Sequence, residues 1–172
     1  MRTTLATLSL SLTIALAASG EKSAPANLRI TSAAFREGAM IPDRFTCKGA
    51  DHNPPLHFEG IPKNAKSLVL IVDDPDAPGG LFSHWLLWNI SPTAMEVSEH
   101  TVPTGAIEGT NDFGKIGYDG PCPPSGTHRY LFRLVALDRK LDLAPGAKRA
   151  ALERAVQSHV LARGELMARG SH

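Results

Sequence analysis

The pattern of hydrophobic and polar positions along the 172-residue chain predicts three long strands. Residues 67–74 (SLVLIVDD) form a run of β-branched residues and leucine without polar alternation, which is typical of a central strand covered on both faces. Residues 84–90 (HWLLWNI) have the aromatic content of a buried strand and are expected to pair with it in antiparallel orientation. Residues 128–138 (HRYLFRLVALD) form the third strand, in which alternation places His128 and Tyr130 on the same face.

Between and after these strands, the sequence predicts long loops and one helix. A short strand is expected at residues 28–35, whereas glycine, proline, aspartate and asparagine punctuate residues 36–66, and residues 91–120 are irregular. Apolar side chains recur at helical spacing within residues 145–164, so this segment is predicted to be a helix of about four to five turns that Gly164 ends. The predicted fold class is mainly β with a C-terminal α-helix and long loops.

Both ends of the chain carry segments that are expected to lie outside a single folded domain, which is placed at residues 28–168. Arg2 precedes an apolar run at residues 5–18 that is too short to span a bilayer comfortably, a combination typical of an export signal. A signal peptide is therefore expected over residues 1–19, with alternative cleavage patterns nearby, and the expected localisation is periplasmic or secreted. The last four residues, RGSH at 169–172, resemble the beginning of a purification tag.

Charge and cysteine content narrow the function classes. The chain has 18 lysine and arginine residues against 17 aspartate and glutamate residues, with no long basic run, so a nucleic-acid partner is not expected. Cys47 and Cys122 lie in a chain that is expected to leave the cytoplasm, where thiols oxidise, and a disulfide between them is the favoured interpretation. The alternative is that Cys122 is a reactive thiol close to His128.

Polar side chains gather at the ends of the three predicted strands. Asp74 and Asp76 come where the first strand stops, His84 begins the second, and His128 with Tyr130 begins the third. Because antiparallel neighbours place the carboxyl end of one strand beside the amino end of the other, Asp74 or Asp76 is expected to lie near His84.

Three motifs in the same order resemble the phosphatidylethanolamine-binding protein family, in particular its bacterial Raf kinase inhibitor-like branch. They are DDPDAP at residues 73–78, SHWLLWN at 83–89 and DFGKIGYDGPCPPSGTHRY at 112–130. The resemblance covers about residues 35–164 and implies an antiparallel β-sandwich with a C-terminal helix. Residues 165–172 (ELMARGSH) depart from the family's pattern, which leaves the final strand unassigned.

The resemblance also implies an anion-binding pocket at one end of the sandwich. The residues that match its ligand-binding positions are Asp74, Asp76, His84, Gly120, Pro123, Pro124, His128 and Tyr130. The prolines fix φ and lower the entropy of the unfolded loop, so this wall of the pocket is expected to hold its shape without a ligand. One cis peptide bond is expected near the pocket, at Ala77–Pro78.

The function expected from these residues and from the resemblance is that of an exported, non-enzymatic binding protein or inhibitor. Its pocket is expected to take a phosphate-type group, either a phospholipid head group such as phosphoethanolamine or a phosphorylated or acidic peptide. A protease or signalling protein is the kind of protein partner expected, and family members suggest a homodimer. No cofactor is expected and no metal site is assigned.

Two other function classes stay open at this point. A hydrolase could use the same cluster as a metal site, or Ser83 or Ser125 as a nucleophile with one of the histidines. No His-x-x-x-His or G-x-S-x-G spacing supports this alternative. A purely structural periplasmic protein would bind neither phosphate nor phospholipid.

Overall fold

The fold is built around β3 (Ser67–Asp74), the central strand of a five-stranded antiparallel sheet. The computed structural model describes residues 28–172, so the predicted signal peptide lies outside the described residues. The strand order is β6-β4-β3-β7-β8, with β4 at Phe82–Ile90, β6 at Ile107–Glu108, β7 at Thr127–Leu137 and β8 at Val160–Ser171. The three long strands predicted from the sequence are therefore confirmed as β3, β4 and β7.

The uninterrupted apolar sequence of β3 has a structural cause, because both faces of the sheet are covered. Leu70 and Val72 belong to the main core, on one face of the sheet. Val69 and Ile71 belong to a second core on the opposite face, which is covered by α1 (Arg149–Val156). Alternate residues of one strand thus enter two different cores.

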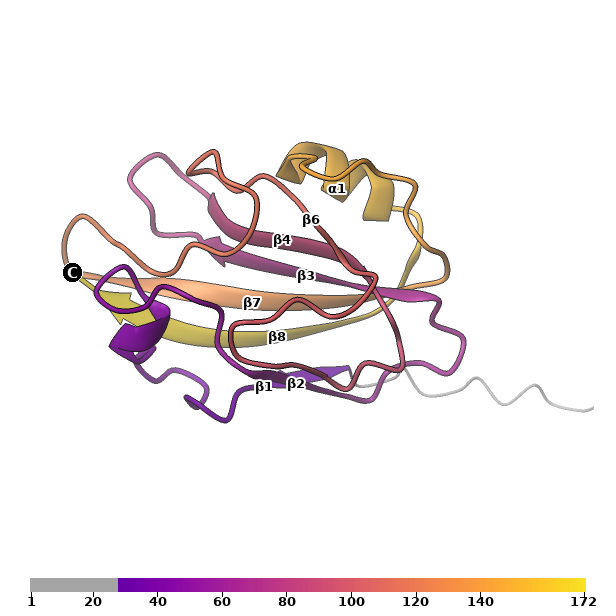
Figure 1. The fold of residues 1–172 in the computed structure, drawn as a ribbon, viewed down its shortest axis with the longest axis horizontal. Coiled ribbons are helices and arrows are strands. Elements are labelled where there is room, and N and C mark those ends of the chain that lie inside the picture. Colours follow the sequence, from indigo (N-terminus) through magenta and orange to yellow (C-terminus); the bar gives the residue numbers. More distant parts are fainter. Residues whose placement is uncertain (1–27) are drawn as a thin grey trace, which may run out of the picture.

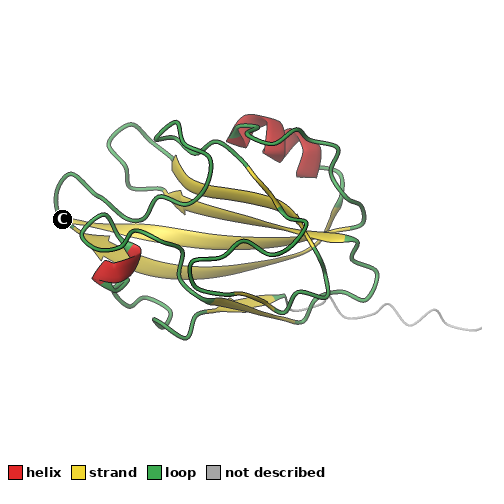
Figure 2. Ribbon diagram, viewed as in Figure 1, coloured by secondary structure: helices red, strands yellow, loops and turns green. Residues whose placement is uncertain are grey.

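A second, three-stranded sheet covers the main core. Its order is β1-β2-β5, with β1 at Arg29–Thr31, β2 at Leu56–Glu59 and β5 at Glu96–Val97. Figure 1 shows β1 and β2 on one side of the large sheet and α1 on the other, and Figure 2 shows the long loops that join the strands. The predicted mainly β sandwich with a C-terminal helix is confirmed.

The second predicted strand is mainly a core element. Trp85 and Trp88 of β4 are both fully buried, and they enter the main core and the second core respectively. A single 3₁₀ turn, η1 (Asp43–Phe45), places Phe45 in the main core as well. The aromatic side chains of residues 84–90 therefore stabilise both layers that pack on the large sheet.

The predicted length of the helix is wrong. Helix α1 has eight residues and ends at Val156, and the chain has already entered β8 at Val160. A short apolar run cannot be assigned to a helix or a strand by its period alone, and here pairing with β7 along the whole length of β8 outweighs local helix propensity. No helix within residues 28–172 is long and apolar enough to cross a membrane.

Gly164 has a different role from the helix terminator that was predicted. It lies inside β8, and a Cβ placed there would collide with the backbone carbonyl oxygen of Leu28. The absence of a side chain therefore allows the chain leading into β1 to cross close to β8. This close approach joins the two layers at the edge of the large sheet.

The final strand, which the sequence left unassigned, is β8 and extends to Ser171. Arg169 exchanges backbone hydrogen bonds with Ala39 and Ile41, and the amide of His172 donates to the carbonyl of Gly126 at 3.0 Å. The folded part of the chain therefore extends past residue 168, where the sequence analysis placed its end. The origin of these residues as a tag remnant stays a prediction.

Candidate functional site

Three strand ends meet at one end of the large sheet and enclose a cavity of about 170 Å³. Asp74 at the end of β3, His84 near the start of β4 and Tyr130 near the start of β7 all line it. The structure therefore brings together the three side chains on which the predicted pocket depends. We call this hollow the strand-end cavity; its remaining lining residues are Ala77, Pro78, Phe82, Phe113, Cys122, Pro123 and Pro124.

Tyr130 contributes a hydroxyl that lies near the Asp74 carboxylate and the Cys122 backbone but forms no hydrogen bond of acceptable geometry with the described residues. The side chain is fully buried, and its hydroxyl has no hydrogen-bond partner among the described residues. An unpaired buried hydroxyl costs about 1–3 kcal/mol. Burial and the nearby Asp74 carboxylate raise the pKa of Tyr130 above its ordinary value, so the phenol keeps its proton and can donate to a ligand.

His84 has one ring nitrogen committed to the protein. Its Nδ1–H donates to the backbone carbonyl of Asp119 at 2.7 Å, because a carbonyl oxygen can only accept. Burial lowers the pKa of His84, so the neutral ring with an unprotonated Nε2 dominates at neutral pH. The ring packs edge-on against Tyr130, with 5.1 Å between the ring centroids. Nε2 therefore accepts a hydrogen bond at neutral pH and donates one when the ring is protonated.

Asp74 has both carboxylate oxygens engaged by the protein. Oδ2 accepts a hydrogen bond from Nδ1–H of His128 at 2.7 Å, and Oδ1 accepts one from the backbone N–H of Asp76 at 2.8 Å. Asp74 and His128 are nearly buried, with side chains 4% and 11% exposed. His128 does not line the strand-end cavity. Its hydrogen bond holds the carboxylate of Asp74 in place.

Asp76 and Gly120 also lie beside the cavity without lining it. The carboxylate of Asp76 accepts two hydrogen bonds from the guanidinium of Arg129, at 2.9 and 2.6 Å, and these bonds hold the pKa of Asp76 far below its ordinary value. The backbone N–H of Gly120 donates to Asp51 at 2.7 Å. In this structure Asp76, Gly120 and His128 form hydrogen bonds with other groups of the protein. Their contact with a ligand stays a prediction.

The sequence analysis missed two aromatic side chains of the cavity, Phe82 and Phe113. Their ring centroids are 4.8 Å apart, and each lies 5.3 Å from that of His84. The alternation of β4 could have identified Phe82, which lies two residues before His84 on the same face. Phe113 carries no such signal, because it reaches the cavity through loop contacts such as the Ser83 amide donating to the Asp112 carboxylate at 2.6 Å.

The proline-rich loop forms one wall of the cavity and is tied to the rest of the protein by a disulfide. Cys47 and Cys122 are bonded, with 5.5 Å between their Cα atoms, so the predicted disulfide is confirmed and the reactive-thiol alternative for Cys122 is wrong. The amide of Cys47 also donates to the carbonyl of Pro121 at 3.2 Å. The disulfide thus fixes the Cys122 wall against the segment that follows η1.

The expected cis bond at Ala77–Pro78 is wrong, since every peptide bond within residues 28–172 is trans. The loop turns instead through glycine. Gly80 adopts a φ of 95°, and its amide donates to the carbonyl of Ala77 at 2.9 Å. A turn that uses the left-handed region at glycine needs no cis proline to reverse the chain.

The serine-hydrolase alternative finds no matching geometry. The hydroxyl of Ser83 donates to the carboxylate of Asp73 at 3.0 Å, on the face of the sheet that α1 covers. Ser125 is exposed, and within residues 28–172 neither serine hydroxyl bonds to a histidine. A nucleophilic serine needs a base within hydrogen-bond reach.

The fold is a β-sandwich whose small strand-end cavity is lined mainly by apolar side chains around Asp74, His84 and Tyr130, and the comparison with known families agrees with this class of protein. A family model described as phosphatidylethanolamine-binding protein matches residues 31–171. The chain belongs to the phosphatidylethanolamine-binding protein family.

Known relatives and solved structures are similar along most of the chain. A UPF0098 protein of Pyrococcus horikoshii is 50% identical over 144 residues, which are 79% of this chain and 73% of that protein. The crystal structure of the phosphatidylethanolamine-binding protein homologue CT736 from Chlamydia trachomatis has a TM-score of 0.81 at 41% identity, covering 84% of this chain and 97% of that one. YbcL of E. coli, described as a new member of the mammalian family, has a TM-score of 0.80 at 29% identity, covering 86% of this chain and 99% of that one.

Proposed function

We propose that the protein is a non-enzymatic binding protein whose strand-end cavity takes a phosphate-type anion. The observation that carries this proposal is the buried hydroxyl of Tyr130, which has no partner among the described residues. An anionic oxygen would accept a hydrogen bond from this hydroxyl and remove the cost of the unpaired donor. Nε2 of His84 would accept a hydrogen bond from a protonated phosphate or from an ammonium group of the same ligand.

The size of the cavity favours a head group over a whole lipid. Its volume of about 170 Å³ lies below the roughly 300–1,000 Å³ that drug-sized ligands fill. Two or three charge-assisted hydrogen bonds at about 1.5–3 kcal/mol each would give about 5 kcal/mol, which corresponds to sub-millimolar affinity. The cavity therefore serves as one anchor of a larger recognition surface.

Exposed apolar side chains near the cavity are suited to supply the rest of that surface. Phe113 lines the cavity and is 44% exposed, and Leu81, which precedes the lining residue Phe82, is 47% exposed. A phospholipid head group or a phosphorylated peptide would present apolar groups next to its phosphate. The phospholipid head group and the phosphorylated peptide both carry the phosphate group that the cavity would bind.

The compartment proposed for this activity is the periplasm or the extracellular space. The Cys47–Cys122 disulfide supports it, since disulfides persist in oxidising compartments. Phospholipid head groups and secreted proteases are ligands and partners that such a protein would meet.

A titration with two matched tyrosine variants tests the proposal. Phosphate and phosphoethanolamine are added to the wild-type protein, Tyr130→Phe and Tyr118→Phe while backbone and side-chain NMR signals are followed. Tyr118 is the control because its hydroxyl already donates to the carbonyl of Phe45 at 2.8 Å, outside the cavity. We expect saturable binding that Tyr130→Phe weakens about ten-fold and Tyr118→Phe leaves unchanged. No saturable binding to the wild-type protein would refute the proposal.

A further inference from the structure

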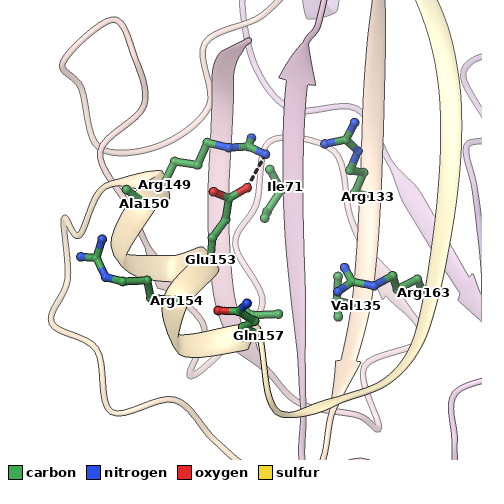
Figure 3. A pocket seen from close by; sticks show the side chains of 10 residues that line it. Ile71, Arg133, Val135, Arg149, Ala150, Glu153, Arg154, Gln157 and Arg163 are labelled. Atoms are coloured by element: carbon green, nitrogen blue, oxygen red, sulfur yellow. Dashed lines mark hydrogen bonds and ion pairs between the residues drawn. The ribbon is translucent and has the colours of Figure 1, made fainter.

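A second hollow lies on the opposite face of the large sheet, between α1 and the strands. It has a volume of about 520 Å³, and Figure 3 shows arginines from β7, β8 and α1 around it. We call it the arginine groove; its lining residues are Ile71, Arg133, Val135, Arg149, Ala150, Glu153, Arg154, Val156, Gln157 and Arg163. Four guanidinium groups and one carboxylate thus surround the groove.

Asp73 holds two of these arginines in fixed positions. The carboxylate is fully buried, and its two oxygens accept separate hydrogen bonds, one from Arg149 and one from Arg133, the latter at 3.1 Å. Arg149 also donates to Glu153 at 2.7 Å, and Arg133 to Glu165 at 3.1 Å. The two guanidiniums are therefore oriented in advance, with part of their charge already balanced.

Arg163 is an exposed arginine that lines the groove. It has no ion pair or side-chain hydrogen bond with any residue between 28 and 172. Figure 3 shows its guanidinium directed across Val135 toward Gln157 on the helix, whereas Arg154 lies farther out along α1. An arginine that lines the same groove as three other arginines and has no carboxylate partner among the described residues attracts an anionic group.

The floor of the groove is apolar. Ile71, Val135 and Val156 lie beneath the charged groups and are 7%, 3% and 6% exposed, so only a small part of each side chain is open to the groove. Next to the arginine groove lies a further hollow of about 340 Å³. It shares Arg133, Val135 and Arg163 with the groove and extends it along β7 and β8. The groove alone falls in the range of about 300–1,000 Å³ that small-molecule sites occupy.

We propose that the arginine groove binds a small amphiphilic anion, an aliphatic or aromatic carboxylate whose acid group pairs with Arg163 and whose hydrocarbon lies on Ile71, Val135 and Val156. The volume and the charge both favour this occupant. A guanidinium binds a carboxylate through two parallel hydrogen bonds, and the hydrocarbon would cover the aliphatic stems of the lining arginines together with the small part of the floor that is open. This site is separate from the strand-end cavity, because the two share no lining residue.

Octanoate and 1-octanol are the probes, because they share an alkyl chain and differ in charge. Each is titrated into the protein while methyl NMR signals of Ile71, Val135 and Val156 are followed. We expect octanoate to shift these signals saturably and octanol to bind about ten-fold more weakly. Arg163→Gln should weaken octanoate binding about ten-fold, whereas Arg36→Gln, an exposed arginine outside the groove, should not change it.

Three results would overturn the proposal. The first is the absence of saturable shifts at the groove methyl groups. The second is equal binding of octanol, or an equal loss of octanoate binding in Arg36→Gln. The third is groove shifts that follow protein concentration and not octanoate, since these would assign the groove to a second copy of the chain. Tyr130→Phe should leave octanoate binding intact, which separates this test from that of the proposed function.

Discussion

Asp73 and Asp74 are neighbours in sequence, yet their carboxylates serve opposite faces of the same sheet. Asp73 binds Arg149 and Arg133 beneath the arginine groove, whereas Asp74 binds His128 beside the strand-end cavity. The period of two along β3 produces this separation. A single strand end therefore positions the groups of two distinct hollows.

Replacing Asp73 should destabilise the protein strongly. Burial raises the pKa of Asp73, and the hydrogen bond and charge of Arg149 offset only part of that shift. The Asp73→Ala substitution would leave Arg149 and Arg133 without their shared acceptor. We expect the free energy of unfolding in urea to fall by about 3–5 kcal/mol. Asp138→Ala is the control, because its carboxylate is 51% exposed and the expected loss is below about 1 kcal/mol. Equal losses in the two variants would contradict this role.

Anion binding should strengthen as the pH falls, at a pH set by His84. Burial lowers the pKa of His84, so protonation and the gain of a donor at Nε2 occur below the ordinary value of about 6.5. Sulfate is a suitable probe because its own charge does not change over this range. We expect its affinity to rise only below about pH 6.5 in the wild-type protein and to stay flat in His84→Gln.

The lowered pKa of His84 should also make the free energy of unfolding depend on pH. Because the folded protein resists protonation of His84, the unfolded chain binds more protons there, and stability is lost as the pH falls from about 6.5 through the lowered pKa. Subtracting the stability of His84→Gln from that of the wild type at each pH isolates this contribution. His57→Gln, at a side chain that is 47% exposed, should give no such difference. A similar pH dependence in both variants would contradict the assignment to His84.

The parts of the fold that the sequence could predict are those where local pattern and tertiary structure agree. The apolar run of β3 requires cover on both faces, and the structure provides two cores. Residues 157–164 were assigned to the helix because apolar side chains recur at helical spacing within residues 145–164, but a run as short as its last part cannot be assigned by its period alone. Only the pairing of β8 with β7, for instance Leu134 with Gly164, settles the choice, and that pairing is not visible in a single segment.

The candidate site was predictable to a similar extent. Antiparallel pairing predicts that Asp74 lies near His84, whereas the position of Tyr130 beside them followed from the resemblance to the family, because the order of the strands in the sheet is not visible in the sequence. Phe113 comes from a loop, where no period relates sequence position to direction. The commitment of Asp76 to Arg129 was equally hidden, because the two residues lie 53 positions apart.

Reducing the disulfide should lower the stability of the protein and weaken phosphate binding in the strand-end cavity. The Cys47–Cys122 bond closes a sequence separation of 75 residues, for which the chain-entropy model gives roughly 4 kcal/mol. We expect reduction to lower the free energy of unfolding by about 2–5 kcal/mol and to weaken phosphate binding, because Cys122 lines the cavity. The double variant Cys47→Ala, Cys122→Ala should show the same losses and no response to reductant. A response of the double variant would mean that the reductant acts elsewhere.

A methyl group at Gly170 should disturb the strand-end cavity from outside. A Cβ placed there would lie 2.7 Å from Cβ of Pro121 and 2.8 Å from Cε2 of Tyr130, so one of these groups must shift. We expect Gly170→Ala to cost about 1–3 kcal/mol of stability and to weaken phosphate binding, because Tyr130 carries the unpaired hydroxyl. Gly79→Ala is the matched control, since a Cβ there meets no atom within 4 Å. Both quantities can be measured by urea unfolding and phosphate titration on the same samples. If Gly170→Ala bound phosphate as the wild type does, the last residues of β8 would not support Tyr130, and the proposed dependence of the cavity on the C-terminal strand would be wrong.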